Sequence, residues 1–157
     1  MNIMKNKRYW ELNDKELGEF FKPLKKEKDT FRLSLEELSH SEIIVVVRVG
    51  KEISGIAGIR KRKMVPVMFI AVKSKYHRKG VGKKLMNKLQ EVARLRYSFM
   101  VLSVMKKNEP AIKLFREFEF EIFKKKSEVY YMIYSFNQKG KFFSKILIKL
   151  SPIFWIF

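Results

Sequence analysis

The hydrophobic pattern of the sequence changes its period between Val65 and Val92, and this change limits the folds that the chain can adopt. Residues 65–72 form a continuous apolar run, which is typical of a strand buried on both faces of a sheet. From Val81 onward, apolar residues recur every three or four positions, which predicts an amphipathic helix. The segment therefore predicts a central strand that leads through a basic loop with Gly80 and Gly82 into a helix.

The rest of the chain predicts a single α+β domain with a mixed central sheet flanked by helices. With 46% hydrophobic residues, the chain has ample apolar surface for one core. We expect strands at 9–12, 43–47, 53–59, 65–72, 99–104, 120–123 and 129–136, and helices near 13–24, 34–37, 81–93 and 108–118. The domain should cover residues 1–136, and residues 137–157 form a basic and apolar C-terminal tail.

Positive charge is concentrated in two parts of the sequence. The net charge is +19, and the stretch 53–90 holds eleven basic residues and no acidic one. Residues 122–157 hold seven basic residues and one acidic residue. Such an imbalance indicates an anionic partner.

Composition also excludes several kinds of site. The chain has no cysteine, so it contains neither disulfides nor a cysteine nucleophile, and with two histidines we expect no metal centre. The first ten residues lack the apolar core of a secretory signal, and no apolar run is long enough to span a bilayer. We therefore expect a cytoplasmic protein.

The loop between the central strand and the helix is the clearest candidate binding site. The first N–H groups of a helix lack intrahelical acceptors and carry positive potential, so they bind phosphate when glycines let the backbone approach. From spacing alone, a plain glycine turn before a surface helix is an equal alternative. The residues expected to hold a diphosphate are His77, Arg78, Lys79, Gly80, Val81, Gly82 and Lys83, with Lys84 beside them.

Two ordered motifs resemble those of the GNAT superfamily of N-acetyltransferases. Residues 77–82, His-Arg-Lys-Gly-Val-Gly, resemble its acetyl-CoA motif [Q/R]-x-x-G-x-[G/A], and residues 108–115 resemble its N-x-x-A-x-x-L-Y signature. The order of elements from Tyr9 to about Phe136 is also similar to that family's. The resemblance implies a GNAT-like fold, acetyl-CoA as cosubstrate, and direct acetyl transfer to a primary amine of a small molecule, a protein N-terminus or a lysine.

Three positions depart from the family pattern. His77 replaces a glutamine or arginine, and Glu119-Phe120 stands where Gly-Phe is common. Phe115 occupies the place of the tyrosine that is often assigned to protonate the departing thiolate. A phenylalanine cannot donate that proton, although a thiol with a pKa near 8.5 is a tolerable leaving group as the anion.

The resemblance also implies the remaining cofactor contacts, while the catalytic residues stay unassigned. Backbone N–H groups at Ile70, Ala71 and Val72 would hold pantetheine and polarise the carbonyl. Asn108 either contacts the pantetheine arm or simply caps a helix. Candidate proton donors are Tyr130, Tyr131, Tyr134 and Ser103, each of which has strand packing as an alternative role, and candidate bases are Glu42, Glu52, Glu109 or a water chain.

A basic nucleic-acid- or ribosome-binding module with a degenerate, non-catalytic coenzyme A site is the alternative function. The basic clusters 60–63 and 124–126 are expected at turns, where phosphate-contacting residues often lie, and weak nonspecific nucleic-acid binding is expected in either case. In the tail, apolar residues recur at helical spacing among lysines. We favour packing of this tail on its own domain over a membrane-surface helix or an oligomer contact.

Overall fold

The computed structural model describes residues 2–5, 14–24 and 38–150, and its contacts divide the chain into two compact units. The first unit comprises Met1–Arg60 and Phe69–Val92, and the second comprises Lys61–Met68 and Ala93–Phe157. The central strand β4 (Val65–Val72) begins in the second unit and ends in the first.

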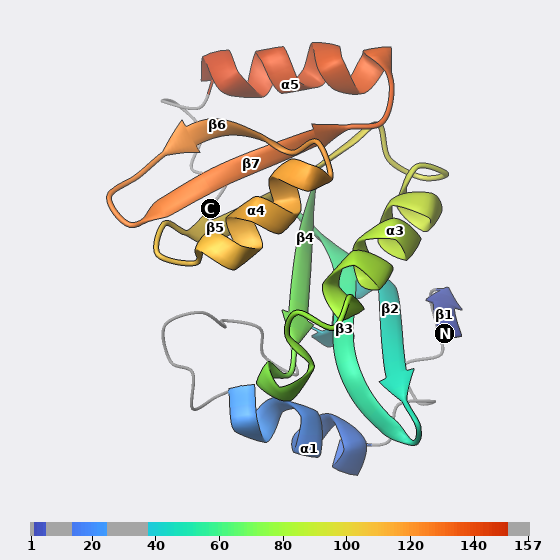
Figure 1. The fold of residues 1–157 in the computed structure, drawn as a ribbon. Coiled ribbons are helices and arrows are strands. Elements are labelled where there is room, and N and C mark those ends of the chain that lie inside the picture. Colours follow the sequence, from blue (N-terminus) through green and yellow to red (C-terminus); the bar gives the residue numbers. More distant parts are fainter. Residues whose placement is uncertain (1, 6–13, 25–37, 151–157) are drawn as a thin grey trace. The chain divides into compact units, whose positions relative to one another are not determined.

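In the first unit the strands follow the order β1 (Asn2–Lys5), β2 (Ser41–Val49), β3 (Glu52–Arg62) and β4 (Figure 1). β2 pairs antiparallel with both β1 and β3. The sequence predicted β2, β3 and β4 to within a few residues but not β1. The strand expected at 9–12 and the helix expected at 34–37 lie outside the described residues.

The turn between β3 and β4 is shorter than the basic turn predicted at 60–63. Arg60 to Arg62 belong to β3, and the turn consists of Lys63 and Met64, with φ angles of 47° and 69°. A two-residue hairpin loop favours positive φ at both positions because its twist then matches that of the strands. This geometry extends β3 through most of the basic cluster.

Helix α1 (Asp14–Leu24) supplies one side of the first unit's core. Its buried residues Leu17, Phe20, Phe21 and Leu24 pack with strand residues that include Ile44, Ile56 and Ala71. Pro23 lies inside the described helix, where its lack of an N–H leaves the carbonyl of Glu19 without its usual intrahelical bond.

Helix α3 (Val81–Ala93) approaches β3 closely at Gly55. A Cβ atom at Gly55 would lie 2.8 Å from Leu85 Cδ1 and 3.0 Å from Val81 Cγ1. The predicted apolar face of the helix is buried, including Leu89 and Val92. Gly55 therefore lets the first turns of α3 rest directly on the strand, which places the N-terminus of α3 near the end of β4 within this unit.

In the second unit the strands follow the order β4, β5 (Phe99–Met105), β7 (Val129–Ser135) and β6 (Glu121–Lys125). β5 is parallel to β4, where Val67 pairs with Val101, and β7 is antiparallel to both β5 and β6. The predicted α+β class with a mixed sheet is therefore confirmed. The basic cluster 124–126, which was expected at a turn, lies mostly in β6, because Lys124 and Lys125 continue that strand.

Helix α5 (Gln138–Leu150) takes up most of the predicted tail and packs against β7 and β5 (Figure 1). Residues 151–157 lie outside the described part of the chain. None of the helices in the described ranges is both long and apolar enough to cross a membrane.

Helix α4 (Glu109–Glu117) is followed, two residues after its end, by a left-handed residue that is not glycine. Glu119 has a φ of 62°, and the N–H groups of Glu119 and Phe120 donate to the carbonyls of Arg116 and Phe115, both at 3.0 Å. These two bonds form the Schellman motif, whose left-handed position is usually glycine. The structure thus explains why Gly-Phe is favoured at positions 119–120 and shows that this chain accommodates a strained glutamate there.

We predict that Glu119→Gly raises the free energy of unfolding by about 1 kcal/mol, because glycine adopts this φ without a Cβ clash. Urea unfolding at neutral pH measures the change. Glu119→Ala is the control, since it removes the same charge but keeps the Cβ atom. Equal stability of the two variants would show that backbone strain is not the cause.

Candidate functional site

The end of β4, the loop after it and the start of α3 form the predicted anion site within the first unit. After Val72 the chain makes a short 3-10 helix, η2 (Ser74–Tyr76), and then a loop in which Arg78 and Gly80 have φ angles of 59° and 77°. The Lys84 N–H donates to the Gly80 carbonyl at 3.0 Å. The N–H groups of Val81 and Gly82 precede this bond, so they lie at the helix end where intrahelical acceptors are absent.

His77 closes the loop onto the strand. Its Nε2 lies 2.8 Å from the Val72 carbonyl oxygen, and its backbone N–H donates to the Ser74 carbonyl at 3.0 Å. Because a carbonyl oxygen only accepts, the imidazole is protonated on Nε2. Both N–H groups of His77 therefore act inside the loop, and the residues from Arg78 onward are those that can meet an anion.

The helix N-terminus is strongly cationic. Arg78, Lys79, Lys83 and Lys84 are exposed, and the first turn of α3 contains no acidic residue. The helix dipole adds positive potential at the same place. This arrangement can bind a diphosphate through backbone N–H groups and charge-assisted contacts.

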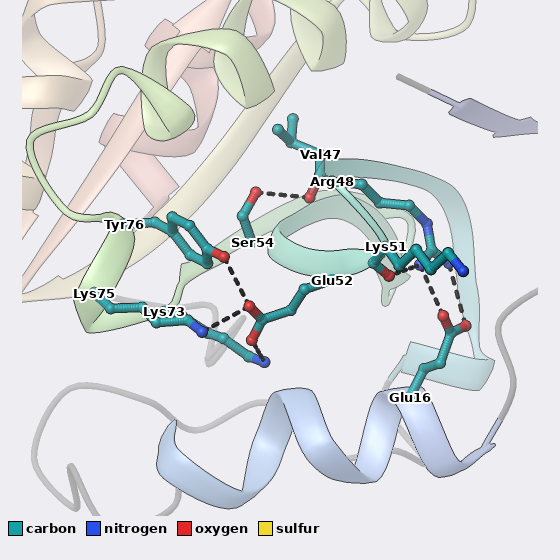
Figure 2. Close-up of polar contacts among 9 residues, drawn as sticks. All are labelled: Glu16, Val47, Arg48, Lys51, Glu52, Ser54, Lys73, Lys75 and Tyr76. Atoms are coloured by element: carbon teal, nitrogen blue, oxygen red, sulfur yellow. Dashed lines mark hydrogen bonds and ion pairs between the residues drawn. The ribbon is translucent and has the colours of Figure 1, made fainter.

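A carboxylate anchors the segment that leads into this loop (Figure 2). Glu52, at the start of β3, accepts from Lys73 Nζ at 2.7 Å on Oε1, and from Lys75 Nζ at 2.6 Å and the Tyr76 hydroxyl at 2.7 Å on Oε2. The Lys73 ammonium is nearly buried and lies 5.7 Å from the centre of the Phe20 ring. One side chain thus binds three of the four residues that follow β4.

These contacts determine the charge state of the cluster. Hydrogen bonds from Lys73, Lys75 and Tyr76 lower the pKa of Glu52 to about 2. The bond to Glu52 raises the pKa of both Lys75 and Tyr76. Glu52 is therefore a carboxylate at neutral pH and a weak base, so its geometry suits anchoring better than the proton abstraction for which the sequence had made it a candidate.

Three further contacts stabilise the same end of the first unit. The Lys73 N–H donates to the Ser54 carbonyl at 3.0 Å, and the Ser54 hydroxyl donates to the Val47 carbonyl at 2.8 Å. Arg48 and Glu16 form a two-pronged ion pair, at 2.8 and 3.2 Å, which joins β2 to α1 (Figure 2). The sequence did not predict these contacts or the Glu52 cluster. For the cluster a signal existed, because Glu52 is the last acidic residue before the acid-free stretch.

In the second unit, Asn108 and Phe115 both belong to α4. Asn108 Oδ1 accepts from the Ala111 N–H at 3.3 Å, so Asn108 caps the helix. Phe115 is 4% exposed, and its ring centre lies 5.8 Å from that of Phe120. Phe115 is thus a packed residue of this unit.

The candidate proton donors lie on β5 and β7 of the second unit. Tyr134 packs against Phe120 and Phe136. Its pKa is raised, mainly by burial and to a lesser extent by the negative charge of Glu119, so it is protonated at neutral pH. Tyr131 is buried, and Ser103 is exposed opposite it on β5. Tyr130 lies near the ammonium groups of two lysines, Lys106 at 5.4 Å and Lys125 at 6.0 Å from its ring centre.

Of the remaining candidate bases, Glu42 is half-buried on β2 and Glu109 is exposed in the first turn of α4. The structure places the predicted loop residues at the N-terminus of α3, beside the end of β4.

Within residues 2–5, 14–24 and 38–150, no three His, Cys, Asp or Glu side chains lie close enough to bind a metal ion.

Comparison with known proteins decides the family. A model of the acetyltransferase (GNAT) family matches residues 8–120. The chain belongs to the GNAT acetyltransferase family. The matched region contains Glu52, the loop before α3 and all of α4, so the candidate cofactor residues lie within it.

Solved structures share the GNAT fold. An acetyltransferase of the GNAT family from Streptococcus pneumoniae is 22% identical with a TM-score of 0.67, covering 85% of this chain and 98% of that one. The ribosomal-protein-S18-alanine N-acetyltransferase from Escherichia coli is 15% identical with a TM-score of 0.65, covering 87% and 94%. A putative acetyltransferase from Salmonella typhimurium, solved with its cofactor acetyl-CoA, is 18% identical with a TM-score of 0.55, covering 61% and 65%. No curated protein sequence matches significantly.

We predict that Glu52→Gln makes this GNAT protein less stable at neutral pH, and that the difference from wild type shrinks as the pH falls. The Glu52 carboxylate has a lower pKa in the folded state, about 2, than its ordinary value of 4.5, so its contribution is present above pH 4.5 and is lost as the pH falls toward 2. Urea unfolding at a series of pH values measures this.

The matched control for this prediction is Glu91→Gln, which removes an exposed pair with Lys88 on α3. Exposed pairs contribute little, so this variant should lower stability less than Glu52→Gln. If the two variants gave the same loss with the same dependence on pH, Glu52 would be an ordinary surface carboxylate.

Proposed function

We propose that the protein is an N-acetyltransferase that moves an acetyl group from acetyl-CoA directly to a primary amine. The observation that carries this proposal is the N-terminus of α3, which combines N–H groups before the first helical bond, a left-handed Gly80 and exposed cations. Membership of the GNAT acetyltransferase family supports the same conclusion.

The residues of the loop fit the diphosphate of coenzyme A. Backbone N–H groups of Val81 and Gly82 would meet the phosphate oxygens, and Arg78, Lys79 and Lys83 would add charge-assisted contacts. His77 and the Glu52 cluster would keep the loop in the binding conformation without touching the anion. The loop would then lose little conformational entropy when the ligand binds, because it is already ordered in the free protein.

The end of β4 would bind the pantetheine arm and the thioester carbonyl of acetyl-CoA. In the proposal, N–H groups at Ile70 to Val72 hold pantetheine and donate to the carbonyl oxygen as negative charge develops on it. The acceptor nitrogen attacks the carbonyl carbon, the carbon–sulfur bond breaks, and the amine proton leaves to a base or to water. Asn108 caps α4 through Oδ1, and its predicted contact with the pantetheine arm would use its amide beside that cap.

Departure of the thiolate does not depend on Phe115. A coenzyme A thiolate leaves without a proton donor more readily than an alkoxide because thiols have a pKa near 8.5. The raised pKa of Tyr134 makes it a weaker acid than an ordinary tyrosine, so it does not distinguish Tyr134 from the other candidate donors. On the base side, the pKa of Glu52 leaves Glu42, Glu109 or a water chain.

The acceptor class is a primary amine, of a small molecule or of a protein N-terminus or lysine. Two structural neighbours are named as ribosomal-protein-alanine N-acetyltransferases, from Brucella melitensis and Escherichia coli, so protein N-termini belong in the first panel of acceptors. The alternative function, a basic nucleic-acid- or ribosome-binding module, gains no support from the family match. The cytoplasmic location stays a prediction.

An acetyl-CoA turnover assay over a panel of amines and peptides tests the function. We expect release of free coenzyme A thiol with at least one class of primary amine, and a mass increase of one acetyl group on that acceptor. Binding of acetyl-CoA without turnover on any acceptor would favour the non-catalytic alternative.

We predict that Gly82→Glu abolishes acetyl-CoA binding, because it places bulk and negative charge where the diphosphate would lie. Isothermal titration calorimetry measures the affinity. Gly18→Glu on α1 is the matched control, since a Cβ atom there meets nothing within 4 Å and the charge change is the same. Unchanged affinity of the Gly82 variant would disprove the assigned site.

A further inference from the structure

The segment between β4 and the loop that leads into α3 carries a lysine that is almost buried. The side chain of Lys73 is 9% exposed, and its ammonium group lies 5.7 Å from the centre of the Phe20 ring and 2.7 Å from Glu52 Oε1. A charge in such a place is stable only while it has an ionic or hydrogen-bonding partner. Glu52 is the carboxylate that supplies this partner (Figure 2).

The backbone of Lys73 joins this buried pair to the candidate site. Its N–H donates to the Ser54 carbonyl at 3.0 Å, and its carbonyl accepts from the Tyr76 N–H at 2.8 Å. Val72, the last residue of β4, immediately precedes Lys73, and His77 immediately follows Tyr76. A movement of Lys73 toward water would therefore carry the start of the loop with it.

Glu52 holds the same segment at two further points. Its Oε2 atom accepts from Lys75 Nζ at 2.6 Å and from the Tyr76 hydroxyl at 2.7 Å. The side chain of Lys75 is 60% exposed, so this ion pair contributes little by itself, whereas the hydroxyl bond fixes the half-buried ring of Tyr76. The carboxylate thus fixes η2 against the start of β3.

We propose that Glu52 is a positioning residue for cofactor binding, which acts through Lys73 and Tyr76 and does not itself touch acetyl-CoA. The inference rests on the proposed function, because the loop that Glu52 positions is the one proposed to hold the diphosphate. With Lys73 fixed beside Phe20, the N–H groups and cations of the loop are ordered before the cofactor binds. Binding then costs less conformational entropy than binding to a loop that has to be ordered.

Electrostatics alone predicts the opposite effect of removing Glu52. Glu52→Gln takes a negative charge away from a unit that is to bind a polyanion, and it leaves the charges of Lys73 and Lys75 uncompensated, so attraction for the cofactor would increase. Positioning predicts weaker binding, because the nearly buried Lys73 ammonium loses its carboxylate and its segment shifts. The direction of the change in affinity therefore distinguishes the two roles.

Isothermal titration calorimetry with acetyl-CoA at neutral pH measures this direction. We expect Glu52→Gln to raise the dissociation constant by about tenfold. Tyr76→Phe removes one bond to Glu52 and keeps the ring, so it should raise the constant by about threefold. The matched control is Glu91→Gln, which removes the carboxylate of an ion pair with Lys88 on α3 and should leave the affinity unchanged or slightly higher.

A double variant shows whether the effect passes through Lys73. Glu52→Gln combined with Lys73→Met removes the buried charge together with its partner, and methionine keeps an apolar side chain beside Phe20. We expect this protein to bind acetyl-CoA about threefold more tightly than Glu52→Gln alone. In the turnover assay the KM for acetyl-CoA should follow the dissociation constants while kcat stays unchanged, which a general loss of stability would not produce.

Each outcome decides between these roles. Unchanged or tighter binding by Glu52→Gln would overturn the proposal and leave the proposed function intact. A loss of affinity that Lys73→Met does not reduce would also overturn it, because the effect would then not pass through Lys73. Wild-type protein that binds no acetyl-CoA would disprove the proposed function, and this inference with it. If Glu52→Gln did not fold, as urea unfolding would show, Tyr76→Phe against the same control would decide.

Discussion

The ion-pair cluster around Glu52 holds together the part of the first unit on which the candidate site depends. A strand end followed by a helix N-terminus creates positive potential, and that end of the molecule also carries several cations that repel one another. Glu52 draws Lys73 and Lys75 onto one carboxylate and adds the Tyr76 hydroxyl. The cluster pairs two of the cations with one carboxylate, which neutralises one positive charge, and leaves Arg78, Lys79, Lys83 and Lys84 exposed, where an anion can meet them.

The two basic regions of the sequence have different structural settings. The stretch 53–90 contains the loop and first turn of α3, where backbone N–H groups and side-chain charges converge on one helix end. The C-terminal lysines lie instead along α5, a helix that packs against β7 and β5. A diphosphate suits the first arrangement because donors converge on one point, whereas the lysines of α5 are spread along a helix and converge on no single point.

Several elements were predictable because their signals are local. The apolar run of β4, the helical period of α3 and the cap at Asn108 each depend on neighbouring residues, and the structure confirms them. The turn at 63–64 was placed incorrectly because basic residues resemble a solvated loop, although β3 extends through most of them. The left-handed Glu119 was visible only as a departure from a motif, since its φ angle depends on how α4 ends.

The sequence by itself determined the order of elements, the family resemblance and the position of the glycine-containing loop, because these follow from periodicity and from residues close along the chain. Only the tertiary structure decided what Glu52, His77 and Phe142 do. Glu52 is more than twenty positions from its lysines, the His77 ring reaches back to the Val72 carbonyl, and Phe142 faces outward because Gly140 fixes the opposite side of α5. Such roles depend on which surfaces of distant segments meet, and a hydrophobic pattern does not specify that.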